Sequence, residues 1–359
     1  VNDGIFIERL DMYNANGDGP TAYGPDGRAL FWNAAGRNPA NAGNFGISNG
    51  TGGAQGKANR PNGIGDVMLL RNTSNGGSQQ FTVGLSKPMV NDWAWSLAYT
   101  YTHATDVSPL TSSQNTSNWG GSLIGNVDED RAYKSRYAIK DRFSGTVNWE
   151  HAFFGNYKTK AGLFYEGRSG RPFSYIFYND ANGDAAATTG NGYFNDLFYV
   201  PNGRGDVVFT GGAALENAFF DWLGKHPDLA RFQGGIAPAN AFRAKWVNSF
   251  DVRVSQELPG FSKEHRSEIA LDIMNIGNLL NSSWGLIEDY GFNSTARVAN
   301  YSGICGAAVT AICPAGSEGK YVYNFSGSTD AASIQENNND KGNTAVSRWS
   351  VMLSLKYKF

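Results

Sequence analysis

The sequence predicts an all-β protein, an antiparallel transmembrane β-barrel with long extracellular loops. Three observations predict it: apolar and polar residues alternate in several segments, short turns alternate with very long connections, and no long apolar run occurs. Alternation gives a strand one apolar and one polar face. In an outer-membrane barrel the apolar face meets lipid, whereas in a soluble sheet it meets a core. The alternation alone therefore leaves both folds open.

The final segment of the chain shows the clearest alternation. Large apolar side chains occupy every odd position from Trp349 to the last residue, and the even positions are mostly polar. A strand places these odd positions on one face, which we expect to face the membrane. The membrane-facing set is Trp349, Val351, Leu353, Leu355, Tyr357 and Phe359.

Earlier segments repeat this pattern and carry charges on their polar faces. Two packed sheets would expose such charges outward, whereas a barrel would turn them toward a wet lumen. The charged positions are Asp251, Arg253, Glu268 and Asp272. The alternating segments are Phe81–Leu85, Trp93–Tyr101, Phe143–Trp149, Ala161–Tyr165, Phe250–Val254 and Ile269–Ile273.

The connections between these segments differ sharply in length. Short turns are predicted near 88–92, 154–157 and 258–264, and they alternate with long loops. Outer-membrane barrels have short periplasmic turns and long extracellular loops, which favours the barrel. The long loops cover about 14–65, 105–136, 179–245 and 291–345, and Ala213–Phe232 has a helical pattern. Further strands are predicted over Ile5–Tyr13, Pro172–Tyr178, Trp284–Tyr290 and Tyr321–Phe325.

Composition narrows the class of protein. The 359 residues carry a net charge of -2, which argues against a nucleic-acid partner. Only 17% of residues are charged, 13% are aromatic, and no segment approaches the roughly 20 apolar residues of a membrane helix. A barrel strand needs only about 9–11 residues, half of them polar, so this composition fits a barrel better than a cytosolic enzyme.

The two cysteines are eight positions apart, at Cys305 and Cys313. Such close spacing in a Gly/Ala-rich loop predicts a small disulfide formed in an oxidising compartment, with two free thiols as the alternative. A zinc site is disfavoured because neither histidine nor further cysteine lies nearby.

Asp180, Asn182 and Asp184 are predicted as calcium ligands in an extracellular loop. Oxygen ligands at alternate positions, with Gly183 permitting a sharp turn, approximate the opening of a calcium-binding loop. A second and weaker candidate is Asn14–Gly19. Neither loop has an acidic residue at the twelfth position, so a plain Asx turn is the alternative reading of each.

No pattern for covalent chemistry is present. The four histidines have no metal-binding spacing, and we find no nucleophile motif, phosphate-binding loop or dinucleotide fingerprint. We therefore expect no enzymatic activity. Aromatic loop residues can bind a ligand by stacking, although packing of loop against loop is the alternative. They are Trp119, Tyr193, Phe194, Phe198 and Trp222.

Three stretches carry a resemblance to a known family. The first is Asn275–Asn281, which reads Asn-Ile-Gly-Asn-Leu-Leu-Asn after a strand; the others are Tyr175–Pro201 and Ser96–Thr105. Together they make residues 66–359 resemble the carboxyl-terminal barrel of TonB-dependent outer-membrane transporters. The subgroup is the Oar-like one, whose members carry a carboxypeptidase-regulatory-like domain before the plug. The terminal strand is also similar to the signal that the barrel-assembly machinery reads.

The resemblance implies a 22-stranded barrel, and we expect residues 1–359 to form its carboxyl-terminal part within a single barrel domain. About ten to twelve strands are counted, and half a barrel would leave two unpaired edges in lipid. The plug and the TonB-binding region would therefore lie upstream of this chain. A small complete barrel of ten or twelve strands is the alternative.

The function implied is TonB-dependent transport of a bulky solute across the outer membrane of a Gram-negative bacterium. Binding would occur in the extracellular loops and passage would be gated by the plug. The implied partners are outer-membrane lipid and lipopolysaccharide, TonB through the upstream region, the assembly machinery, and an unknown solute or peptide. Two alternatives stay open: a passive porin or autotransporter-type barrel, and a surface-exposed structural or adhesive protein.

Overall fold

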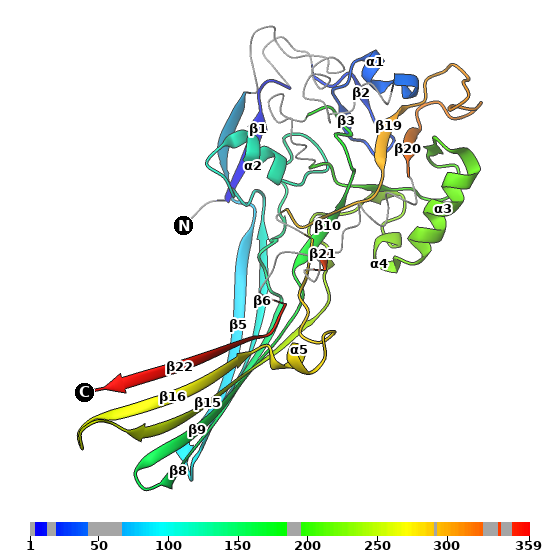
Figure 1. Cartoon of the computed structure of the whole chain (residues 1–359). Helices are drawn as coiled ribbons and strands as arrows, with labels where there is room; N and C mark the ends of the chain where they lie inside the picture. Colours follow the sequence, from blue (N-terminus) through cyan, green and yellow to red (C-terminus); the bar gives the residue numbers. More distant parts are fainter. Residues whose placement is uncertain are drawn as a thin grey trace.

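The computed structural model describes residues 4–12, 19–41, 67–184, 195–290, 293–325, 337–338 and 347–359. These residues form a sheet of long strands and, at one end of it, a body of shorter elements (Figure 1). We call this second part the loop body; it comprises the described residues of 4–73, 107–132, 135–140, 169–246 and 287–349. Within the described residues, no helix combines the length and apolarity needed to cross a membrane.

The sheet is eight-stranded and its main path runs β22-β16-β15-β9-β8-β6-β5. Every neighbouring pair is antiparallel, as the alternation predicts, and the short β7 pairs with the end of β6. The strands are β5 (Gly77–Val90), β6 (Trp93–Asp106), β7 (Tyr133–Lys134), β8 (Asp141–Phe154), β9 (Tyr157–Arg168), β15 (Val247–Pro259), β16 (Arg266–Met274) and β22 (Ser350–Lys358).

Tight turns join the strands at the end of the sheet remote from the loop body (Figure 1). Asn91 and Asp92 have φ values of 53° and 66°, the left-handed pair required by the commonest two-residue hairpin. Gly155, at φ 62°, begins the turn between β8 and β9. We call this the turn end and the opposite one the loop end.

Strand register places most of the large apolar residues of the seven long strands on one face. Leu85 lies opposite Leu97, Val252 opposite Ile273, and Leu271 opposite Leu353. We call this the apolar face. A continuous exposed surface of this kind normally marks contact with a membrane or a protein partner. Its exposed members include Val83, Leu85, Leu97, Val147, Leu163, Val254, Leu271, Leu353 and Leu355.

Aromatic side chains lie toward both ends of the apolar face. At the turn end the ring centroids of Trp93 and Trp149 are 6.4 Å apart, and at the loop end those of Tyr165 and Phe250 are 4.8 Å apart. Trp93 and Tyr101 both face this side of β6, eight residues apart. At a rise of about 3.3 Å per residue this is about 26 Å, close to the roughly 25 Å apolar band of outer-membrane barrels.

The opposite face of the sheet is polar and carries ion pairs in mid-strand. Arg253 lies 2.8 Å from Asp272 and 3.4 Å from Glu268, while Lys160 lies 2.7 Å from Glu257. The charges predicted to point away from lipid therefore share one face, which we call the polar face. A cavity of about 540 Å³ lies over it.

The sheet does not close on itself in the described part of the chain. There β5 pairs only with β6, and β22 pairs only with β16. The count of ten to twelve barrel strands was too high for this part, because several predicted strands form in the loop body. They are β1 (Gly4–Arg9), β10 (Pro172–Ile176) and β20 (Tyr321–Asn324). Of Trp284–Tyr290 only β17 (Glu288–Asp289) is a strand, and Asn275–Asn281 contains a short helix, α5 (Ile276–Leu280).

The loop body is built from short elements around an aromatic core. Its largest helix, α3 (Gly212–Gly224), and α4 (Pro227–Ala230) divide the predicted helical segment, because Pro227 favours a new first turn. Two of its ladders, β10 with β18 and β12 with β20, are parallel, unlike the main sheet. The fully buried aromatic residues include Phe31, Phe177, Phe198, Phe219, Tyr321, Tyr323 and Phe325.

The remaining elements of the chain are all short. The helices are α1 (Ala34–Arg37), the 3₁₀ turn η1 (Pro39–Asn41) and α2 (Asn115–Gly121). The strands are β2 (Ala22–Tyr23), β3 (Ala29–Leu30), β4 (Met68–Thr73), β11 (Tyr199–Val200), β12 (Val208–Phe209), β13 (Gly235–Ile236), β14 (Phe242–Arg243), β18 (Thr295–Arg297), β19 (Asn300–Ile304) and β21 (Asn337–Asn338).

Candidate functional site

The predicted calcium loop follows β10 and is folded around its own backbone. Asp180 accepts hydrogen bonds from the amides of Gly183 at 2.5 Å and Asp184 at 3.2 Å. Gly183 has a φ of 84°, which glycine adopts readily, and a Cβ there would lie 3.0 Å from the backbone nitrogen of Trp32. The Asp-x-Asn-Gly-Asp sequence thus makes a tight turn packed against the β3 region.

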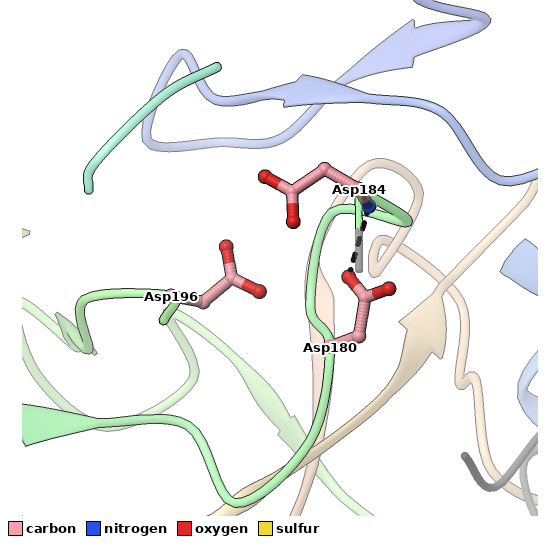
Figure 2. Close-up of side chains that lie close together, drawn as sticks. All are labelled: Asp180, Asp184 and Asp196. Atoms are coloured by element: carbon pink, nitrogen blue, oxygen red, sulfur yellow. Dashed lines mark hydrogen bonds between the residues drawn. The ribbon is translucent and has the colours of Figure 1, made fainter. Parts of the chain in front are cut away.

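Three carboxylates converge beside this turn, and we call them the acidic cluster: Asp180, Asp184 and Asp196. One oxygen from each lies within 4.8 Å of the others, and all three side chains are buried (Figure 2). Asp196 comes from the segment before β11. Its position is fixed by the amide of Ala181, which donates to Asp196 at 2.8 Å.

Asn182 does not point into the cluster as an independent ligand. Its side-chain nitrogen donates to the Asp184 carboxylate at 2.7 Å, and its side-chain oxygen accepts from the Asp184 amide at 3.0 Å. The structure therefore brings together two of the three predicted ligands and replaces the third with Asp196. The segment containing Asp196 was singled out only for its family resemblance, since spacing along the chain could not place it here.

Arg28 connects the acidic cluster to the amino-terminal segment. Its guanidinium lies 2.9 Å from Asp196 and 3.4 Å from Asp26, and it also donates to the carbonyl of Leu197. The side chains of Arg28 and Asp196 are both 0% exposed. Burial alone would lower the pKa of Arg28, but Asp26 and Asp196 outweigh this effect and raise it, so the residue stays cationic.

Arg9 makes a parallel connection from the end of β1. It donates to the backbone carbonyl of Asp184 at 2.5 Å and forms a buried ion pair with Asp11 at 2.7 Å. The guanidinium also lies over the ring of Trp119, 5.0 Å from its centroid. Two buried arginines thus attach the amino-terminal segment to the loops that carry the acidic cluster.

The environment favours the protonated form of Asp196. Burial raises the pKa of its carboxyl well above the usual range, and the neighbouring Asp184 raises it further, while Arg28 acts in the opposite direction. A divalent cation at the cluster would favour the ionised form instead. Protonation of Asp196 and binding of a cation would therefore each reduce the repulsion between the carboxylates of the acidic cluster.

The geometry of the cluster suits a calcium ion. Calcium binds oxygen ligands at about 2.3–2.6 Å, so two ligands of one ion lie within about 5 Å of each other. The oxygens of Asp180, Asp184 and Asp196 meet this condition. The calcium assignment stays a prediction, now carried by these three residues. The weaker candidate at Asn14–Gly19 lies almost wholly outside the described residues.

We expect calcium and pH to act on the stability of the loop body through the same carboxyls. A raised folded-state pKa of Asp196 stabilises the fold at low pH, and this stability is lost as pH rises above about 4 through the folded value. In a chelator, the melting temperature should thus be higher at pH 5 than at pH 8. Calcium at a hundredfold excess over its Kd should add about 2.7 kcal/mol at pH 8.

Asp184→Asn tests this prediction by thermal unfolding followed with near-ultraviolet circular dichroism. The variant removes a calcium ligand and a charge that raises the pKa of Asp196, so both the calcium effect and the pH effect should shrink. Asp228→Asn, at an exposed carboxylate in α4, is the matched control and should behave as the parent does. Identical responses of the parent and Asp184→Asn to calcium would exclude the site.

Other residues singled out from the sequence have structural positions. Cys305 and Cys313 form a disulfide that links the end of β19 to the following loop. Trp119 and Phe198 are buried, and Trp222 packs against the aromatic core, so their rings support loop packing. Tyr193 and Phe194 lie outside the described residues.

The comparisons with known proteins add no assignment: no family model, curated protein or solved structure matches the chain.

Proposed function

We propose that this chain forms the carboxyl-terminal part of a TonB-dependent outer-membrane transporter that moves a bulky solute. The observation that carries the proposal is the apolar face. Leu353, Leu271 and Val254 belong to one uninterrupted apolar surface across the long strands. A solvent-facing sheet surface of this extent is unfavourable in water and favourable in a bilayer.

The polar face supports a lumen on the other side of the sheet. Arg253, Asp272 and Glu268 form a partly exposed network there, at the middle of β15 and β16. Charged side chains at membrane depth are found facing a protein interior or a water-filled cavity. The same strands therefore present an apolar surface on one side of the sheet and a charged, hydrated surface on the other.

The open edges of the sheet support a larger barrel. In the part of the chain that the structure describes, the outer edges of β5 and β22 are unpaired. Such edges would be costly in hydrocarbon, because each unsatisfied backbone group there costs several kcal/mol. In the proposed 22-stranded barrel, other strands of the complete protein pair with these two edges and a plug occupies the lumen. The loop body, with its own buried core, then stands on the extracellular side as the solute-binding part.

The test compares cells that make the full-length protein with cells that lack it. Both are given a mixed pool of peptides and oligosaccharides, and depletion of the pool is read by mass spectrometry. We expect depletion of one solute class, abolished when the inner-membrane proton gradient is collapsed. Depletion that persists without the gradient would instead establish a passive porin, and surface attachment without depletion would establish an adhesive protein.

A further inference from the structure

A small cavity, which we call the hairpin cavity, lies in the loop body beside the turn that joins β2 to β3. Its volume is about 140 Å³, and its walls come from three segments, residues 26–28, 125–133 and 236–238. The first two segments are tied together, because the side-chain oxygen of Asn126 accepts a hydrogen bond from the amide of Ala29 at 3.2 Å. The fold of the loop body thus forms the cavity where three distant parts of the chain meet.

The charges around the hairpin cavity cancel. Asp26 and Arg28 form its buried wall, where their side chains are 1% and 0% exposed and lie 3.4 Å apart. Glu129 and Arg131 also line it, 3.8 Å apart, and the Arg131 side chain is 65% exposed. Two carboxylates and two guanidinium groups leave no excess of either sign. The lining therefore favours an occupant without net charge.

The Glu129 carboxylate is held in place as a hydrogen-bond acceptor. Its Oε2 atom accepts from the backbone amides of Gly125 at 2.8 Å and Asn126 at 3.3 Å. Its Oε1 atom accepts from the Tyr133 hydroxyl at 2.8 Å. An ionised carboxylate has about four lone-pair sites, so this one can accept a further hydrogen bond from a ligand.

Two hydrogen-bond donors line the cavity near this acceptor. The Arg131 guanidinium lies over the Tyr133 ring, 5.1 Å from its centroid, and its 3.8 Å separation from Glu129 is longer than a hydrogen bond. Among the residues that the structure describes, none accepts a hydrogen bond from the Asn126 side-chain nitrogen. A lining with both donors and acceptors suits hydroxyl groups, because each hydroxyl both donates and accepts.

Apolar surface completes the lining and limits the size of the ligand. Ile236 and Pro238 line one side, and the Tyr133 ring adds to another. These surfaces gain dispersion energy from C–H groups of a ligand ring. A volume of about 140 Å³ equals that of roughly five water molecules at about 30 Å³ each. The space therefore holds one small ring with its substituents.

We propose that the hairpin cavity binds the terminal sugar unit of a neutral oligosaccharide. This inference rests on the proposed function, because it takes the loop body as the solute-binding part and names the class of solute. A neutral sugar unit has no net charge, several hydroxyls and apolar C–H faces, so it matches the lining in all three respects. The end of a peptide matches less well, because its terminal amino or carboxyl group is charged at neutral pH.

The experiment measures binding of methyl glycosides of neutral hexoses and pentoses to the full-length protein by saturation-transfer NMR. The detergent has no sugar head group, so it does not compete. Glucuronate, glucosamine and diglycine are the anionic, cationic and zwitterionic comparison ligands. The test variant is Arg131→Met, which removes the guanidinium donors. Arg204→Met is the matched control, because Arg204 is also an exposed arginine of the loop body and lies 5.2 Å from the centroid of the Phe220 ring.

We expect at least one neutral glycoside to bind the parent protein more tightly than any of the comparison ligands. Loss of a hydrogen bond from a charged donor should raise the Kd for that glycoside about tenfold in Arg131→Met. Arg204→Met should bind it with the Kd of the parent. An unchanged Kd in Arg131→Met would overturn the proposal. So would tighter binding of a charged comparison ligand, or binding of no neutral glycoside at all.

Uptake by cells is scored separately from binding in detergent. Binding of a neutral glycoside without any depletion of solute by cells would overturn the proposed function and leave the sugar site standing. Gradient-dependent depletion of peptides alone, with no glycoside bound, would overturn only the sugar site.

Discussion

Arg28→Met is expected to lower the free energy of unfolding of the loop body by about 3–5 kcal/mol, the usual cost of breaking a buried ion pair from one side. Methionine approximates the length of the side chain but leaves the Asp26 carboxylate without its cation, and it removes the guanidinium that favours the ionised form of Asp196. Asp26 retains a hydrogen bond from the Tyr321 hydroxyl at 2.6 Å. A hydrogen bond from this neutral hydroxyl does not neutralise the charge of the Asp26 carboxylate.

The effect should extend beyond the immediate contacts. Arg28 also lies 5.3 Å from the ring centroid of Phe177 in the aromatic core and donates to Leu197 next to the acidic cluster. Its loss therefore loosens the attachment of the 19–41 segment and changes the surroundings of Asp196 together. We expect amide hydrogen exchange to rise across residues 19–41 and 195–200 and to stay unchanged in the long strands.

Arg71→Met is the matched control. Arg71 forms an ion pair with Glu8, but its side chain is 52% exposed, and such exposed pairs contribute about 0–1 kcal/mol. Amide hydrogen exchange across residues 19–41 and 195–200 is measured for both variants under the same conditions. Similar losses of unfolding free energy in the two variants would mean that burial does not strengthen the ion pairs of Arg28. That result would contradict the role assigned to Arg28.

The long strands could be predicted from the sequence because the signal is local. In each of the seven long strands, apolar and polar residues alternate along the chain. A shift of one residue in the register of a strand would therefore move its apolar side chains to the polar face and its charges to the apolar face. The Asp180–Asp184 turn could also be predicted, since its aspartates, asparagine and glycine act within five residues.

The rest of the candidate site depends on contacts that no local pattern contains. Arg28 and Asp196 are 168 residues apart, and Asp196 reaches Asp180 only because the loop body folds around a shared core. The described part of the 14–65 segment is attached to the acidic cluster through Arg28, and its partner there is Asp196. The partner could not be identified, because arginines and aspartates are frequent in loops and spacing carries no information across such distances.

Leu353→Arg is expected to cost about 2–4 kcal/mol in the free energy of folding into phospholipid vesicles, the cost of arginine at the bilayer midplane. Leu353 is 70% exposed on β22 and lies opposite Leu271 of β16. It is four residues from both Trp349 and Tyr357, or about 13 Å along the strand from each aromatic boundary. This spacing places it near the middle of the proposed membrane band.

Met352→Arg is the matched control on the adjacent position of the same strand. Met352 lies opposite Asp272 on the polar face, where the cavity is lined by Asp251, Glu268 and Asp272 against Arg253 and Lys160. An added arginine there gains carboxylate neighbours and remains hydrated. We expect a change of less than about 1 kcal/mol, as for exposed charge pairs.

The difference between these two neighbours is the decisive quantity, because it depends on what each face of the sheet meets. Urea titration of the full-length protein in vesicles measures it, with both variants and the parent in the same lipid. A bilayer on the apolar face requires Leu353→Arg to be the worse variant by at least about 1 kcal/mol. Equal costs, or a parent protein that folds as well in water without lipid, would show that the apolar face does not contact hydrocarbon.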